Sequence, residues 1–252
     1  MRMVGQTTLY FGLLVFATPA VAQELPPPDS LYVTTRCALN DGVTFEDAVE
    51  EARSQHQQLG DGGPNSVFYR QPIAGRNAAP NQFIRVVRWD NMEHWASPGN
   101  PPTNNTHTCD NSNRWFSTNR TVGTNQTAYS KSSDRSSLVS SRRCTLNAGT
   151  TIGDAYRFLS RIQAAREAQD DTSTMHLSHR FIGPSNGTEM RTRIVIRLIG
   201  ESADGLARTF DAQMAGDVGI GTPASAPVQH CEDPILTRSY IIHGLDGVGS
   251  SQ

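Results

Sequence analysis

Hydrophobic and polar positions follow the same order of elements twice along this chain. Residues 31–39 (LYVTTRCAL) are rich in β-branched and aromatic side chains, which predicts a strand. Apolar residues at helical spacing follow Thr44, a good capping residue, and predict a helix over residues 45–59. The first unit is completed by strands at 66–70 and 83–89, a short helix through Trp95 and a last strand that begins at Cys109.

The second unit begins with a predicted strand at 138–146 and a helix that Thr151 caps and that runs to about residue 169. It continues with strands at 175–182 and 191–199, a helix at 202–215 and a strand from Cys231 to about His243.

The start of each unit is also similar in sequence. Residues 36–48 (RCALNDGVTFEDA) and 143–155 (RCTLNAGTTIGDA) match at eight of thirteen positions. An internal repeat constrains the whole fold. The predicted organisation is a signal peptide (1–22), a proline-rich leader (23–30), repeat one (31–120), a flexible polar linker (121–137), repeat two (138–245) and a tail (246–252).

Each repeat has the element order β-α-β-β-α-β, which is the ferredoxin-like pattern of an α+β protein. Helices cover one sheet face in such a unit, so we expect the two bare faces to pack sheet to sheet. The duplicated order resembles the dimeric α+β barrel superfamily, with both halves on one chain. That group includes antibiotic-biosynthesis-monooxygenase-like and NIPSNAP-like domains. The resemblance implies an intramolecular dimeric α+β barrel with a cavity between the repeats.

The first residues have the features of an export signal. Arg2 is followed by an apolar run at 9–17 and by the small residues Ala20-Val21-Ala22. The run is too short to span a bilayer, and no later stretch reaches about 20 apolar residues. We therefore expect a periplasmic or extracellular protein that is not held in a membrane after cleavage.

Four cysteines in an exported chain predict two disulfides, for which three pairings exist. In the β-α-β-β-α-β pattern the first and last strands are antiparallel neighbours. The pattern therefore selects Cys37–Cys109 and Cys144–Cys231.

The overall charge and the known motifs exclude several classes of function. The formal net charge is −2, which argues against a nucleic-acid partner. No Cys or His spacing is typical of zinc, and there is no glycine-rich phosphate loop or nucleophile elbow. We expect neither a metal nor a cofactor.

Strand alternation provides one specific functional indication. In 191–199 the apolar alternate positions should face the helices, which turns Arg197 toward the space between the sheets. Arg88 is its counterpart in repeat one, and Arg36 and Arg143 lie opposite Cys37 and Cys144 on their strands. Four arginines and Trp89 then form a candidate site for a small anionic or aromatic ligand. Internal carboxylates or solvent at an open barrel end are alternative partners for these charges.

Two main functions remain in view. The first is an exported small-ligand-binding or interaction module. The alternative, implied by the resemblance, is a cofactor-free monooxygenase-like or isomerase-like enzyme with Asn91, His94 and Trp95 around its pocket. The explanation that we favour for these aromatic residues is that they are parts of the core or of a lid. Outer strand edges could also pair two chains, so the oligomeric state is open.

Overall fold

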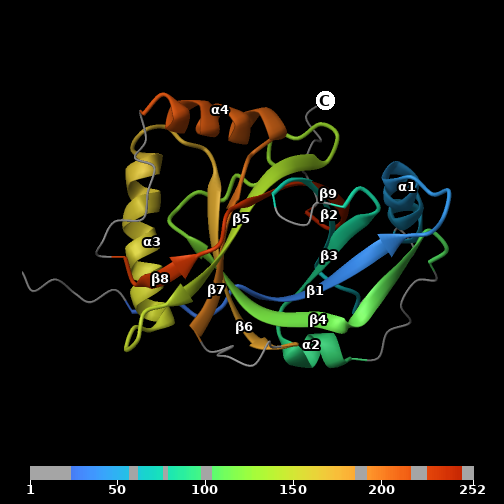
Figure 1. Ribbon diagram of the computed structural model, residues 1–252, viewed down its shortest axis with the longest axis horizontal. Coiled ribbons are helices and arrows are strands. Elements are labelled where there is room, and N and C mark those ends of the chain that lie inside the picture. Colours follow the sequence, from blue (N-terminus) through green and yellow to red (C-terminus); the bar gives the residue numbers. More distant parts are fainter. Residues whose placement is uncertain are drawn as a thin grey trace, which may run out of the picture.

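The chain forms a ring of antiparallel strands with its helices on the outside (Figure 1). The computed structural model describes residues 24–56, 62–75, 79–97, 104–184, 192–216 and 226–245. The predicted signal peptide (1–22) and tail (246–252) lie outside the described residues. Within those ranges no helix combines the length and the apolar character needed to cross a bilayer.

The strands follow the predicted positions closely. They are β1 (Ser30–Leu39), β2 (Ser66–Ala74), β3 (Gln82–Trp89), β4 (His107–Val122), β5 (Ser136–Leu146), β6 (Thr174–Ile182), β7 (Arg193–Ile199), β8 (Val228–Cys231) and β9 (Ile235–His243). The helices are α1 (Phe45–His56), α2 (Met92–Ala96), α3 (Ile152–Glu167) and α4 (Ala203–Met214). The sheet order is β7-β6-β4-β1-β3-β2-β9-β5, and β5 pairs with β7, so eight strands close a barrel. The ninth strand, β8, adds to β5.

The predicted fold class, two tandem ferredoxin-like repeats packed sheet to sheet, is wrong. The two halves meet edge to edge, where β4 pairs with β6 and β2 pairs with β9. Face-to-face sheets would leave four strand edges with unpaired backbone groups, whereas closure pairs them. The observed barrel fits a dimeric α+β barrel only in coarse outline.

Helix capping follows directly from the local sequence. At α1 the Thr44 backbone N–H donates to Asp47 at 2.9 Å, and the Asp47 N–H donates to the Thr44 hydroxyl at 3.1 Å. Thr151 and Asp154 form the same capping box at α3. The capping boxes therefore fix the residues at which α1 and α3 begin.

The apolar faces of these helices pack against the outer faces of the barrel strands. Phe45 and Val49 of α1 pack with Cys37 and Phe83, and a second cluster joins α3 to β5, β6 and β7 through Leu159, among others. Full burial of one such side chain contributes about 1.5–3 kcal/mol. Because strand side chains alternate, the residues between these outward positions face the barrel interior.

Both predicted disulfides are confirmed. Cys37 lies directly opposite Cys109 in the β1–β4 pair, and Cys144 lies opposite Cys231 in the β5–β8 pair. The last predicted strand is interrupted at 232–234, so that Cys231 belongs to β8. Two disulfides suit an oxidising compartment, which is consistent with export.

The segment between β4 and β5 is folded, not the flexible linker that composition predicted. It crosses one end of the barrel as a series of turns, and only 2% of Tyr129 is exposed. The Tyr129 hydroxyl donates to Ser239 of β9 at 2.6 Å, and its ring stacks on Phe68 of β2. Tyr129 has a φ of 64°, a conformation that is uncommon without glycine. We call Tyr129 the plug residue.

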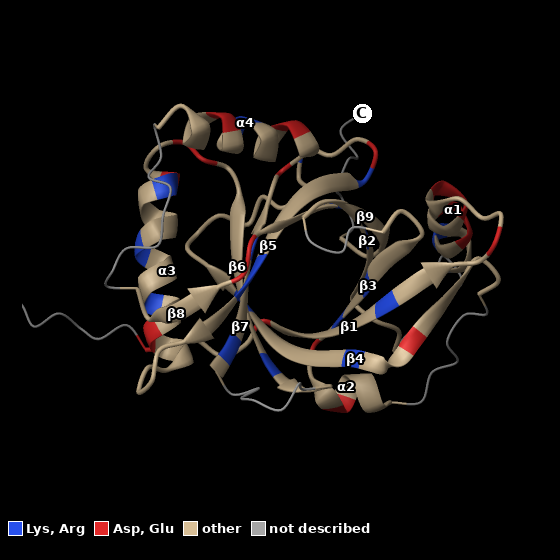
Figure 2. Ribbon diagram, in the orientation of Figure 1, with Lys and Arg blue, Asp and Glu red and all other residues tan. Residues whose placement is uncertain are grey.

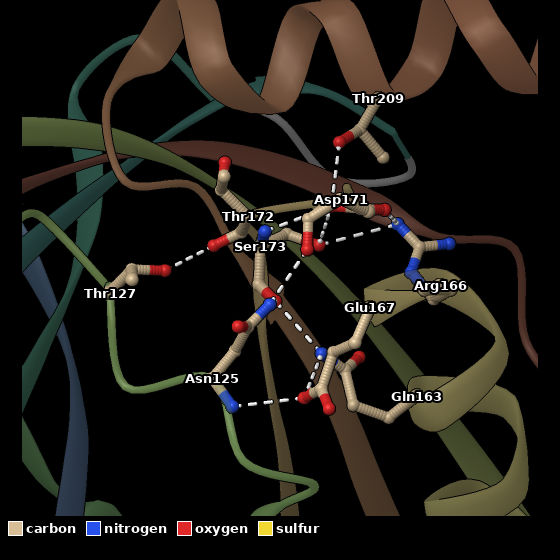
Figure 3. A network of polar contacts seen from close by, with 9 residues as sticks. All are labelled: Asn125, Thr127, Gln163, Arg166, Glu167, Asp171, Thr172, Ser173 and Thr209. Atoms are coloured by element: carbon tan, nitrogen blue, oxygen red, sulfur yellow. Dashed lines mark hydrogen bonds and ion pairs between the residues drawn. The ribbon is translucent and has the colours of Figure 1, made fainter. Parts of the chain in front are cut away.

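A polar network anchors this segment to α3 and α4 (Figure 3). Glu167 accepts hydrogen bonds from the backbone of Thr124 and Asn125 at 2.9 Å each. Arg166 and Asp171 form an ion pair in which each side chain is only 7% exposed. Asp171 also accepts from Thr209 of α4 at 3.1 Å. The network therefore joins the segment between β4 and β5 to both helices of the second half.

The proline-rich leader is also docked. Leu25 packs against the core cluster beneath α3, and the Pro26 carbonyl accepts a hydrogen bond from Arg120 Nε at 2.7 Å. These contacts fix residues 24–29 along β4, although composition alone indicated an extended segment without a core.

Candidate functional site

The barrel interior contains a small chamber that all eight barrel strands line. Its volume is about 70 Å³, and we call it the inner chamber. Four of its lining residues are arginines that come from four different strands. They are Arg70 of β2, Arg143 of β5, Arg180 of β6 and Arg197 of β7. Figure 2 shows basic residues in blue on the barrel strands, including β5 and β7.

Arg197 and Arg70 are the two buried arginines of this chamber, at 6% and 4% exposure. Arg197 donates a short hydrogen bond to the Ser178 hydroxyl, and its guanidinium lies over the Tyr32 ring. Arg70 Nε donates to the Ser239 hydroxyl at 3.3 Å. Within the described part of the chain, no carboxylate forms an ion pair with either arginine. A buried charge without a counter-charge is costly, because neutral hydroxyls and rings replace only part of its hydration.

The electrostatics of the chamber reflect this surplus of positive charge. Burial, and then the neighbouring charge of Arg70, lowers the pKa of Arg197 to about 9. Burial also lowers the pKa of Arg180 to about 10, with Arg143 contributing next. An anion in the chamber would reverse both effects, because it would restore the lost solvation and oppose the mutual repulsion.

The outer pair, Arg143 and Arg180, lies toward solvent. The Arg180 guanidinium lies 4.6 Å from the centroid of the Trp115 ring. Arg143 approaches Glu232 at 3.7 Å, and 52% of that glutamate side chain is exposed. Beyond this pair is a wider cavity of about 210 Å³, which we call the mouth. The inner chamber and the mouth share Ile84, Arg143, Glu232, Asp233 and Ile235.

A third cavity of about 160 Å³ lies at the plugged end, and we call it the plug chamber. Its walls include Tyr32, Phe68, Arg88, Tyr129 and His176. Burial lowers the pKa of His176 to about 3, and the charge of Arg197 adds to the effect. The imidazole is therefore neutral near pH 7. Arg70 also lines this chamber, so it separates the two interior cavities.

The structure distributes the four predicted arginines over three places. Arg143 and Arg197 line the inner chamber. Arg88 lines the plug chamber instead. Arg36 is exposed at the end of β1 and lines the mouth together with Arg143. The four therefore do not converge on a single site.

The candidate enzyme residues lie on the outer side of the barrel, around α2. Asn91 caps α2 by accepting from the His94 N–H at 2.9 Å. The His94 ring contacts Asp90 and the Gly63 carbonyl, and Trp89 packs edge-to-face on it at 5.0 Å. Trp95 packs in the same manner on Phe116. Each of these residues has a structural role, and we assign none of them to the interior site.

Sequence reasoning missed Arg70, Arg180, His176 and Tyr129. The strand alternation that selected Arg197 also marks Arg70 and Arg180, because Tyr69 and Leu177 occupy outward positions on the same strands. Tyr129 has no such signal, since it lies in a polar segment whose path only the assembled barrel determines.

One group of potential metal ligands occurs in the described ranges: Cys37, His107 and Cys109. Two of its members form a disulfide, so their sulfurs are not the thiolates that metals require.

Comparisons with known proteins identify no family for this chain. No protein-family model and no curated protein matches it. One similar solved structure is an anthrone oxidase-like protein, with 12% identity over 92% of this chain and 98% of that chain and a TM-score of 0.47. Another is a putative monooxygenase from Fusobacterium nucleatum, with 6% identity over 86% and 94% of the two chains and a TM-score of 0.47. A putative monooxygenase from Lactobacillus acidophilus has 10% identity over 85% and 95%, with a TM-score of 0.44. These likenesses are too distant to assign an activity to the chain.

Proposed function

We propose that this protein is an exported binding protein that holds a small anionic ligand in the inner chamber. The observation that supports it is the pair of buried guanidinium groups, Arg70 and Arg197, which have no carboxylate partner in the described structure. Two buried charges without counter-charges lower the free energy of unfolding, so their presence suggests a role in binding. An anion with acceptor oxygens would supply the missing charge and would accept the remaining N–H groups.

Isothermal titration calorimetry with two simple aromatic anions, benzoate and phenyl phosphate, tests this proposal. At least one of them should bind, and Arg197→Met should abolish that binding. Arg142→Met is the matched control, because Arg142 neighbours Arg143 on β5 but lies on the outer face, beneath α3 and α4. Absence of binding of both anions, or equal loss in the two variants, contradicts the proposal.

A second candidate is a cofactor-free enzyme that removes a proton from an acidic C–H bond. The observation that favours it is the neutral His176, which lies opposite Arg197 on the neighbouring strand. With its pKa of about 3 the imidazole by itself is a weak base, but the negative charge of a bound ligand would oppose the effect of Arg197 and raise that pKa. The nearby guanidinium groups can stabilise the enolate that results from proton transfer.

Phenylpyruvate, an enolisable aromatic anion, is a suitable probe for this activity. Its methylene protons should exchange with D₂O faster in the presence of the protein than with buffer alone, as followed by NMR. His176→Phe should abolish the acceleration while phenylpyruvate still binds. An unchanged exchange rate in this variant excludes His176 as the base.

A further inference from the structure

Given the proposed anion site, we infer that the inner chamber takes the doubly charged headgroup of a phosphate monoester, and that the remainder of the ligand lies in the mouth. Charge, size and connectivity each support this assignment.

The inner chamber has an excess of positive charge. Four guanidinium groups line the inner chamber, and the carboxylates of Glu232 and Asp233 are the acidic groups that line it. The difference is an excess of two positive charges. Both carboxylates are at the exposed rim, whereas Arg70 and Arg197 are buried. A single negative charge leaves part of the excess unmatched, and a dianion neutralises it.

The geometry of the donors agrees with this charge. Three of the four arginines come from the adjoining strands β6, β7 and β5, and Arg70 comes from β2, which lies beyond β9. Their N–H groups therefore approach the chamber from an arc of five neighbouring strands and not from a single strand. A planar carboxylate presents two oxygens in one plane, whereas a phosphoryl group presents three terminal oxygens in a tetrahedral arrangement. Arginine forks pair with phosphate oxygens in charge-assisted hydrogen bonds.

The chamber has room for a headgroup and little more. Its volume of about 70 Å³ is that of a few water molecules, because a cavity of roughly 10–15 Å³ holds one. The adjoining mouth is about three times larger, at about 210 Å³, and shares its border with the inner chamber at Arg143 and Ile84. Pro72 and Phe83 add apolar surface there, so the organic part of a monoester has a place outside the headgroup site.

Phenyl phosphate and phenyl sulfate form the decisive pair of probes. They have the same shape, but the sulfate carries one charge, whereas the phosphate carries two above its second pKa of about 6. By calorimetry at pH 7.5, phenyl phosphate should bind at least about tenfold more tightly, a difference of about 1.4 kcal/mol. At pH 5 roughly nine tenths of the phosphate is a monoanion, so a tenfold advantage should fall to about twofold.

Other groups near the site also titrate, and phenyl sulfate controls for them. Glu232, Asp233 and His230 line the mouth. Any effect of their titration changes the binding of phenyl sulfate as well, so the ratio of the two affinities isolates the charge of the ligand. His176 stays neutral over this range, since its pKa is about 3.

Variants assign the preference to the outer arginines. Arg143→Met and Arg180→Met should each lower the ratio of phosphate to sulfate affinity toward one, whereas Arg142→Met should leave it unchanged. Phthalate, an aromatic dianion whose two charges lie on separate planar carboxylates, tests geometry against charge. Equal binding of phthalate and phenyl phosphate overturns the phosphate assignment.

The outcomes separate this inference from the proposal on which it rests. One outcome is that benzoate and phenyl sulfate bind as tightly as phenyl phosphate and that Arg197→Met abolishes the binding of all three. That result would support the anion site and contradict the phosphate assignment. If none of the probes binds, both the anion site and the phosphate assignment are contradicted.

Discussion

The guanidinium carbon of Arg197 lies 5.6 Å from the centroid of the Tyr32 ring, across the barrel interior from β7 to β1. The electron-rich face of the ring stabilises a cation, by about 2 kcal/mol when the contact is desolvated. This contact and the hydrogen bond to Ser178 keep a buried charge in place without an acidic partner. Under the proposed function, this arrangement leaves Arg197 available to pair with an anion.

Replacement of Arg197 should separate stability from binding. We expect Arg197→Met to leave the free energy of unfolding unchanged or to raise it by up to about 2 kcal/mol, because an apolar side chain of similar length removes a buried, unpaired charge. Urea denaturation measures this, with Arg142→Met, at a half-buried position on the outer face of the barrel, as the control. A loss of more than about 2 kcal/mol means that Arg197 is a structural residue.

The plug residue should contribute to stability through both its ring and its hydroxyl. Tyr129→Phe removes the hydrogen bond to Ser239 and should cost about 1 kcal/mol. Tyr129→Ala also empties the space against Phe68 and should cost about 3–5 kcal/mol. Urea denaturation of both variants checks the order. Equal, negligible losses would show that the segment does not close the barrel in solution.

Each disulfide should stabilise its own half of the chain. The bonds join residues 72 and 87 positions apart, which corresponds to about 4.5 kcal/mol each in the chain-entropy description. Cys144→Ser should therefore lower the melting temperature under oxidising conditions only. Thermal unfolding with and without a reductant measures the difference. An unchanged melting temperature in the oxidised variant contradicts the Cys144–Cys231 pairing.

The Asp171 carboxylate should be essential to the network in Figure 3. Asp171→Asn leaves Arg166 buried without its counter-charge, so we expect a loss of about 3–5 kcal/mol. Asp170→Asn is the matched control, because Asp170 is exposed and asparagine tolerates its φ of 58°. Chemical denaturation compares the two variants. Similar stabilities would indicate that the ion pair is not formed in solution.

His176 should make stability depend on pH below neutrality. In the unfolded chain its imidazole takes up a proton below about pH 6.5, whereas the folded ring, with its pKa lowered to about 3, stays neutral. The unfolded state then binds more protons, so the free energy of unfolding falls as the pH falls from 6.5 toward 3. His176→Asn should flatten this slope by up to one proton.

Stability curves at several pH values, together with NMR titration of the ring, check this prediction. His230→Asn, at an exposed site, is the control and should leave the slope nearly unchanged. An NMR-measured pKa of His176 near 6.5 contradicts the prediction.

Much of the local structure could be predicted from the sequence. Alternation located the strands, Thr44 and Thr151 marked the helix starts, and the two similar segments led to the correct disulfides. Strand alternation also predicted that Arg197 faces the interior. These features depend on neighbours along the chain or on one strand pair, so short patterns are sufficient to specify them.

The fold class and much of the site could not be predicted in this way. Asn91, His94 and Trp95 have suggestive chemistry, yet α2 uses them for capping and packing outside the barrel. Arg36 and Arg88 share a strand face with the other arginines but occupy different heights along the barrel. Alternation specifies the face of the strand on which a side chain lies. Its position along the barrel axis and its neighbours on other strands depend on how strands from both halves are staggered.

The sequence by itself determined where the strands and helices lie, how the helices are capped and which cysteines pair. Only the tertiary structure decided that the sheets close edge to edge, that Tyr129 plugs one end and that Arg70, Arg143, Arg180 and Arg197 line one chamber. The physical reason is that edge pairing is made by backbone groups, which all residues except proline share. The choice of partner strand therefore depends on the packing of the whole chain and leaves little trace in any local pattern.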